Sequence, residues 1–156
     1  MRAPTAEVSE PLDLSPLRAM VGFNIHMLDL LQYQVFYQEF GGDTFTPGVF
    51  STLAAIRQNP GIRHGALADA LLIQRPNLTT LINKLEREGY VCRKPSRDDK
   101  RWVVLYITDK GSRAVDKMLE RMQSHDRLVT GGLSAAERRT LLALLDKLQA
   151  SLVSAM

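Results

Sequence analysis

The most informative residues lie between positions 75 and 88, where polar and basic side chains share one face of an expected helix. A projection at about 100° per residue collects the apolar side chains on the other face, namely Leu78, Leu81, Ile82 and Leu85. The polar face and its flanks carry no acidic residue at the centre and consist of Arg75, Pro76, Asn77, Thr79, Thr80, Asn83, Lys84 and Arg87. Asparagine can form two hydrogen bonds with adenine, threonine can contact a base edge, and arginine or lysine can bind guanine or phosphate. The segment predicts a helix that reads a DNA major groove, with a solvated amphipathic helix as the alternative.

A run of basic residues at 93–101 follows and contains five positive charges in nine positions. The segments on either side, 90–93 and 102–107, are rich in β-branched and aromatic residues and predict two strands. The run then lies at the tip of a hairpin, where we expect DNA backbone or minor-groove contacts from Arg97, Lys100 and Arg101. Without the flanking strands, an exposed and solvated loop would explain the run equally well.

Two acidic residues, Asp98 and Asp99, interrupt this basic run, although a free carboxylate there would repel phosphate. We expect Asp99 to pair with Arg101 and to stiffen the loop, so that Asp99 belongs to the DNA-binding tip as a brace. An exposed aspartate in a turn is the alternative.

The residues at 46–111 are predicted to form one lobe that positions the polar helix. Thr46 and Pro47 are a helix-start signal, and the helix that they begin carries Val49, Phe50, Leu53 and Ile56 inward before it stops at 59–61. A short helix at 64–71, a break at 72–73 and the helix at 75–88 then form a helix-turn-helix. Together with the hairpin, this order of elements predicts a winged helix-turn-helix.

Long amphipathic helices are expected on both sides of this lobe. Apolar residues spaced by threes and fours predict one continuous helix at 15–40. Thr108 begins another long helix, and a capping box of Ser134 and Glu137 precedes the last one. The fold class is therefore mainly α, with a small two- or three-stranded β wing.

The composition is that of an ordinary globular chain of 156 residues, with 45% hydrophobic and 24% charged residues and a net charge of +3. No apolar stretch reaches the roughly 18 residues that a membrane span requires. The first residues lack the apolar core of a signal peptide, so we expect no membrane partner and a cytoplasmic location. The charge is uneven, at −3 over 1–60, +4 over 61–110 and +2 over 111–156, so an anionic partner is expected at the middle third.

Catalytic and metal-binding motifs are not evident in the sequence. Three histidines, His26, His64 and His125, fall on different expected helices without ligand spacing, so we expect no metal and no cofactor. Cys92, the single cysteine, is expected to be a buried structural thiol rather than a redox sensor. Nucleophile-elbow, phosphate-loop and zinc-protease motifs do not occur, so an enzyme has no candidate residues. The main alternative to DNA binding is a winged-helix module that docks an acidic protein partner.

Several segments in a fixed order resemble the MarR (multiple antibiotic resistance regulator) family. They are FTPGVF at 45–50, NPGI at 59–62, LA at 67–68, RPNLTTLINKLEREGYV at 75–91, DKR at 99–101 and LYITDKG at 105–111. The resemblance covers roughly residues 15–153. The turn at 71–73 departs from the family pattern because it lacks the usual glycine, and YVC at 90–92 is an uncommon form of the following strand.

The resemblance implies a homodimer whose first and last helices interlock, so that two lobes read a palindrome in double-stranded operator DNA. The chain then divides into a flexible arm at 1–14, a helical dimerisation region at 15–45 and 112–156, and a DNA-binding lobe at 46–111. Family members are typically repressors released by small effectors such as aromatic acids, phenolic compounds or aryl-acyl-coenzyme A thioesters. The corresponding pocket positions here are His26, Tyr33, Phe36, Tyr37, Phe50 and Leu53, with Arg63 or Arg18 as a cation for an acidic effector. Each of them is explained equally well as a core or interface side chain.

Overall fold

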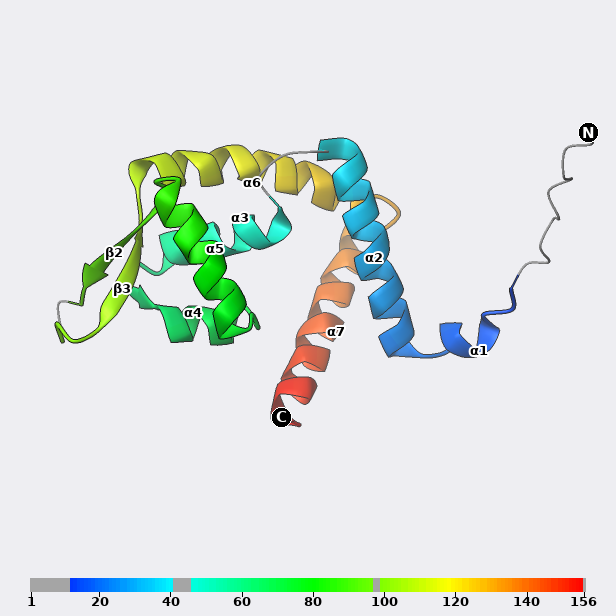
Figure 1. Ribbon diagram of the computed structural model, residues 1–156. Coiled ribbons are helices and arrows are strands. Elements are labelled where there is room, and N and C mark those ends of the chain that lie inside the picture. The colour runs from blue at the N-terminus through cyan, green and yellow to red at the C-terminus, as the bar shows by residue number, and fades with distance from the viewer. Residues whose placement is uncertain (1–11, 41–45, 97–98, 156) are drawn as a thin grey trace, which may run out of the picture. The chain divides into compact units, whose positions relative to one another are not determined.

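The computed structural model describes residues 12–40, 46–96 and 99–155 (Figure 1). It is mainly helical with one three-stranded antiparallel sheet, which confirms the predicted fold class. The chain consists of two compact units, Met1–Gly42 and Asp43–Met156. Most of the arm expected at 1–14, as well as Arg97 at the hairpin tip, lies outside the described residues. None of the helices in the described ranges is long and apolar enough to cross a membrane.

The first unit contains two helices, α1 (Ser15–Arg18) and α2 (Val21–Phe40), so the prediction of one continuous helix was wrong. The side chain of Asn24 accounts for the break, because its amide nitrogen donates hydrogen bonds to the carbonyl oxygens of Arg18 (2.8 Å) and Met20 (2.7 Å). The first bond satisfies a carbonyl group at the end of α1, and the second adds to the bond that the Met20 carbonyl oxygen accepts from the Asn24 backbone nitrogen at 3.2 Å. The regular apolar spacing could not reveal the break, since it is the same in a broken and in a continuous helix.

The apolar side chains of α2 are mostly exposed, and only Phe36 is buried. The exposed ones are Val21, Ile25, Leu28, Leu30, Leu31, Tyr33, Val35 and Tyr37. An apolar surface of this extent on one helix is typical of a face that a partner covers.

The second unit begins with α3 (Pro47–Gln58), β1 (Ile62–Arg63), α4 (His64–Ala70) and α5 (Arg75–Arg87). Thr46 caps α3 as predicted, since its hydroxyl oxygen accepts a hydrogen bond from the backbone nitrogen of Val49 at 3.3 Å. The core of this unit joins side chains from all three helices, including Leu53, Ile56, Leu67, Leu78, Ile82 and Leu85. Figure 1 shows α5 extending from α4 at its N-terminal end to α6 at its C-terminal end.

The turn between α4 and α5 contains Leu72 at a φ of 53°, in the left-handed region that favours glycine. A side chain there costs about 1–2 kcal/mol because Cβ approaches the following carbonyl oxygen. The backbone nitrogen of Ile73 donates a 3.0 Å hydrogen bond to the carbonyl oxygen of Ala68 and closes the turn. The turn of the helix-turn-helix therefore forms without a glycine, and Leu72 carries the backbone strain of the left-handed conformation.

The wing is the hairpin of β2 (Val91–Pro95) and β3 (Val103–Ile107), and both strands agree with the prediction to within two residues. The two-residue strand β1 pairs with the other edge of β3, which gives the sheet order β1-β3-β2. Leu105 of β3 lies opposite Ile62 of β1 on one side and Arg93 of β2 on the other. β1 was not predicted, because only its pairing with a distant strand defines it.

Thr108 and Gly111 together join α6 (Asp109–Val129) to the end of α5. The Thr108 hydroxyl donates to the carbonyl oxygen of Gly89 (2.7 Å), and its oxygen accepts from the backbone nitrogen of Gly111 (3.0 Å). A Cβ atom at Gly111 would lie 2.1 Å from the carbonyl oxygen of Tyr90, so only glycine fits there. The two residues thus let the start of α6 pack directly on the backbone that follows α5.

The last helix, α7 (Ala135–Ser154), begins with the predicted capping box, in which the Ser134 and Glu137 side chains each bond the other residue's backbone nitrogen. None of its residues is buried. Its exposed apolar side chains include Leu141, Leu142, Leu144, Leu148 and Leu152. Like α2, this helix presents apolar surface that a single chain leaves in water.

Candidate DNA-binding site

The exposed face of α5 carries the side chains that the sequence singles out. The exposed residues are Arg75, Pro76, Asn77, Thr79, Thr80, Asn83 and Arg87, while Lys84 is half-buried. Leu78, Ile82 and Leu85 are buried on the other face and fix the rotation of the helix about its axis. The basic residues Lys84 and Arg87 lie in the last turn, where the helix dipole favours cations. The arrangement leaves uncharged hydrogen-bonding groups in the middle of the face and cations at both ends.

The two threonines of this face have fixed hydroxyl directions. Thr79 donates to the carbonyl oxygen of Arg75 (2.8 Å) and Thr80 to that of Pro76 (3.1 Å). A hydroxyl has a single proton, so each side chain presents oxygen lone pairs and a methyl group outward. The methyl group suits contact with thymine, and the oxygen suits a donor on a base edge.

His64, at the start of α4, contacts the same face through its Nε2 atom, which lies 3.2 Å from the hydroxyl oxygen of Thr79. Burial, followed by the nearby charges of Arg93 and Arg75, lowers the pKa of His64 below its ordinary value. The ring is therefore neutral near pH 7. Because the Thr79 proton is already donated to the backbone, Nε2 carries the proton in this contact.

Arg93 connects the wing to α5. Its Nη2 atom donates a 2.7 Å hydrogen bond to the side-chain oxygen of Asn83, and its Nη1 atom forms an ion pair with Glu86. The sequence placed Arg93 only within the basic run and missed this link. The alternation of side chains along β2 could have indicated this link, because Arg93 lies on the same strand face as the buried Val91.

The tip of the wing contains the predicted brace. The Arg101 guanidinium donates to both carboxylate oxygens of Asp99, from Nε to Oδ1 (3.0 Å) and from Nη2 to Oδ2 (2.8 Å). The backbone nitrogen of Arg101 also donates to Oδ1 at 3.0 Å. Together with the backbone bond, this side-chain pairing holds the pKa of Asp99 below its usual value. The pairing that we predicted between these residues is confirmed, and Lys100 between them is exposed.

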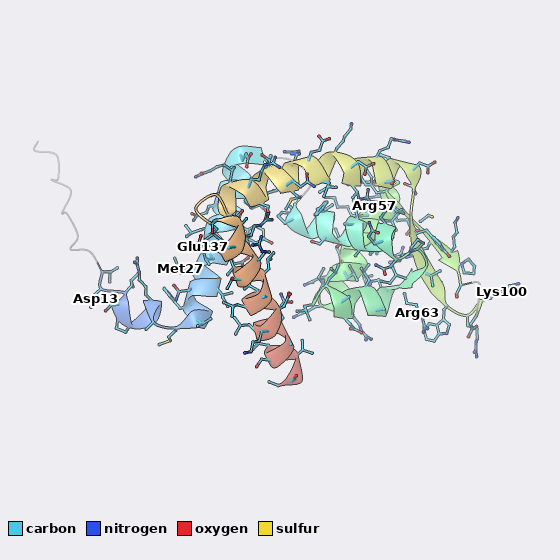
Figure 2. The ribbon with its side chains drawn as sticks, turned by 180° about the vertical axis from the view of Figure 1, so that it is seen from behind. Asp13, Met27, Arg57, Arg63, Lys100 and Glu137 are labelled. Atoms are coloured by element: carbon cyan, nitrogen blue, oxygen red, sulfur yellow. The ribbon has the colours of Figure 1, made fainter. Side chains whose placement is uncertain are left out.

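Arg63, expected as a cation for an effector, lies on β1 beside the wing. Its guanidinium carbon is 5.3 Å from the ring centroid of Trp102, a distance typical of a cation–π contact. Figure 2 shows Arg63 and Lys100 at the same end of the second unit. Arg63 therefore adds a positive charge next to the wing.

The other expected effector residues are divided between the two units. His26, Tyr33, Phe36 and Tyr37 lie on α2, where the rings of Tyr33 and Tyr37 stack with centroids 6.3 Å apart. In the second unit, Leu53 is completely buried in the core and Phe50 packs against that core while half-buried. Cys92 lies on β2 and is half-buried, which is less burial than we expected.

A helix-turn-helix followed by a hairpin with a cationic tip defines a winged-helix DNA-binding lobe. The comparisons with known proteins agree: the model of the MarR family matches residues 45–103. The chain belongs to the MarR family of transcriptional regulators. Members of this family are DNA-binding proteins and not enzymes.

Individual relatives support this assignment. The chain is 35% identical over 103 residues to a putative transcriptional regulatory protein for the hcr operon of Thauera aromatica, a match that covers 66% of this chain and 62% of the relative. Among solved structures, the transcriptional repressor CouR bound to a 23-mer DNA duplex has a TM-score of 0.82 and 27% identity, with 90% of this chain and 99% of CouR covered. BpsR of Bordetella bronchiseptica, whose DNA binding is regulated by 6-hydroxynicotinic acid, shares the fold at a TM-score of 0.79 and 22% identity, over 90% of this chain and 98% of BpsR.

Proposed function

We propose that this chain is a homodimeric repressor that binds a palindromic operator and leaves it when a small aromatic effector binds. The observation that carries the proposal is the polar face of α5, which has no acidic residue at its centre and which Arg93 ties to a cationic wing. CouR, a repressor of the same fold, is bound to duplex DNA, which supports the same use of this face here.

Two kinds of DNA contact follow from the positions of the side chains. Base contacts come from the middle of α5, through Thr79, Thr80 and Asn83, together with Arg75 at its start. Pro76 and Asn77 in the first turn and Lys84 and Arg87 in the last turn approach the neighbouring backbone. The wing residues Arg97, Lys100 and Arg101 bind phosphate or the minor groove, and Asp99 holds the tip in shape.

The dimer is assigned to the segments 15–45 and 112–156, which leaves 46–111 as the DNA-binding lobe. The exposed apolar side chains of α2 and α7 support this division, because a symmetric partner would remove them from water. Two recognition helices must lie about 34 Å apart to enter successive major grooves on one side of the duplex.

The effector is proposed to be an aromatic acid, a phenolic compound or an aryl-acyl-coenzyme A thioester. His26, Tyr33, Phe36 and Tyr37 on α2, with Phe50, Leu53 and Arg63, are the candidate contacts, since aromatic rings and a cation suit such a ligand. An effector that binds more tightly to a dimer with a different helix spacing would lower operator affinity by the ratio of its affinities for the two states.

The operator hypothesis is tested by measuring affinity for the DNA upstream of the gene at several salt concentrations. A log–log slope of several units and at least about 1,000-fold preference over random duplex are expected. A flat salt response or equal affinity for random DNA would instead favour a module that docks an acidic protein. For the effector, a thermal-shift screen of aromatic acids, phenols and their thioesters should yield a compound that also releases the DNA, and a screen without one would remove this part of the proposal.

A further inference from the structure

A second cationic site lies away from the exposed face of α5, between Tyr90 and the first half of α6. We name it the α6 groove; it is a cavity of about 330 Å³ lined by Tyr90, Lys110, Arg113, Ala114, Lys117, Met118 and Arg121. Four of these seven side chains are cations and none is acidic. A concave site with several converging charges of one sign is typical of a ligand site rather than of a merely solvated surface.

Lys110 is held in position at one end of the α6 groove. Its Nζ atom donates a 2.7 Å hydrogen bond to the carbonyl oxygen of Glu88 and lies 4.6 Å from the ring centroid of Tyr90. Both partners are uncharged, so they orient the ammonium group without cancelling its charge. One cation of the site is therefore in place before any ligand arrives, which lowers the entropy cost of binding.

The other three cations follow Lys110 along one face of the helix, at intervals of three, four and four residues, as Arg113, Lys117 and Arg121. Like charges at these spacings repel one another in a helix. Two of the four acidic residues of α6 are paired with other helices, Asp116 with Arg57 of α3 at 2.6 Å and Asp126 with Arg138 of α7, while Asp109 and Glu120 lie on the same helix as the cations.

We propose that the α6 groove binds a diphosphate group carried by a small molecule. Arginine binds phosphate oxygens in pairs, and lysine adds point charges. Lys110, Arg113 and Lys117 alone carry three positive charges, which match the charge of a diphosphate better than that of a single carboxylate. The cavity volume is at the lower end of the range for small-molecule sites, about 300–1,000 Å³, which suits a diphosphate and part of the group attached to it.

The concave shape of the α6 groove, rather than its position, favours a small molecule over operator DNA as the source of these phosphates. Tyr90 follows the C-terminal end of α5, three residues after Arg87, for which we propose a contact with the DNA backbone. Random duplex DNA is therefore included in the test below as the second source of phosphate.

The test is a calorimetric titration of the full chain with inorganic pyrophosphate at low salt. The double variant Arg113→Ala, Lys117→Ala removes two exposed cations of the groove, and Arg139→Ala, Lys147→Ala on α7 is the matched control with the same loss of charge. Pyrophosphate should bind the groove variant at least tenfold more weakly, and the control within twofold of the unmodified chain. Equal weakening in both variants would show a general charge effect and overturn the proposal.

Two further measurements keep the result unambiguous. In the unmodified chain, pyrophosphate should shift the backbone amide resonance of Ala114 in the groove and leave that of Gly132, outside it, unchanged; an unchanged Ala114 would contradict the site even if the variant failed to fold. A random duplex separates the two sources of phosphate. If the groove variant lost duplex affinity by the same factor as pyrophosphate affinity, the site would bind DNA backbone and the small-molecule proposal would be wrong, independently of whether the α5 face reads an operator.

Discussion

The Nη2 atom of Arg93 on β2 lies 2.7 Å from the side-chain oxygen of Asn83 on α5, so a wing strand orients an exposed amide of the recognition helix. The same guanidinium is also paired with Glu86, one turn further along α5. Asn83 is thereby held with its NH2 group available for an acceptor on a base edge, while its oxygen retains a second lone pair. Arg93 therefore acts as a positioning residue for the base contact that we assign to Asn83.

Replacing Arg93 should reduce sequence discrimination more than overall DNA affinity. In Arg93→Ala the Asn83 amide loses its fixed direction, and we expect the preference for operator over random duplex to fall about tenfold, or about 1.4 kcal/mol. Lys94→Ala is the matched control, because Lys94 carries the same charge on the next residue but contacts the Tyr106 ring instead. Competition binding with operator and random duplex measures this preference. An equal loss of preference in the two variants would show that Arg93 contributes only its charge to DNA binding.

Asn83 and Arg101 are expected to affect binding in different ways. Asn83→Ala should change the preferred base at one position of each half-site and cost about 1–3 kcal/mol on the original sequence. Arg101→Ala should weaken all duplexes by a similar factor and lower the salt slope by about one unit. A panel of single-base operator variants read at two salt concentrations separates the two patterns. The reverse assignment of patterns would show that the wing reads bases and α5 does not.

For the wing brace of Asp99 and Arg101, we predict that removing a negative charge weakens DNA binding, although net charge alone would predict tighter binding. Asp99→Asn makes the tip more positive, yet it removes a charged acceptor for the Arg101 guanidinium and backbone. We expect roughly threefold weaker operator binding, because a freely moving Arg101 loses more side-chain entropy when it binds phosphate. The control Asp146→Asn, an exposed site on α7, changes the charge equally. Tighter binding by Asp99→Asn would mean that this carboxylate only repels DNA.

The parts of this fold that could be predicted from the sequence are those set by neighbouring residues. Thr46, Thr108 and Ser134 each accept the backbone hydrogen bond expected of a helix cap, because a cap involves only the next three residues. The exposed face of α5 likewise follows from helical periodicity. What depends on distant partners was missed, notably strand β1 and the bond from Arg93 to Asn83.

His64 should make the folded state less stable in mild acid. Its pKa is lowered in the fold, first by burial and then by Arg93 and Arg75, so between that value and about 6.5 the unfolded chain binds more protons. The free energy of unfolding should therefore rise with pH up to about 6.5. Above that pH, His64 should no longer contribute to the pH dependence. His64→Gln should flatten the rise, whereas His26→Gln on exposed α2 should retain it. Urea unfolding at fixed protein concentration across this range checks the slope, and an unchanged slope in His64→Gln would place the titrating group elsewhere.

The junction between α5 and α6 allows the sharpest test of packing. In Gly111→Ala the new Cβ atom would meet the Tyr90 carbonyl oxygen at 2.1 Å and a side-chain carbon of Ile107 at 2.7 Å. The backbone cannot yield without breaking the Thr108 bonds at the same junction, so we expect a loss of about 2–3 kcal/mol in unfolding free energy. Gly132→Ala is the matched control, since nothing lies within 4 Å of its added Cβ. Urea unfolding of both variants at one protein concentration should show the loss only at position 111, because the control gives up no contact and gains no clash. Equal stability of the two variants would mean that α6 does not pack on the Tyr90 backbone as closely as described.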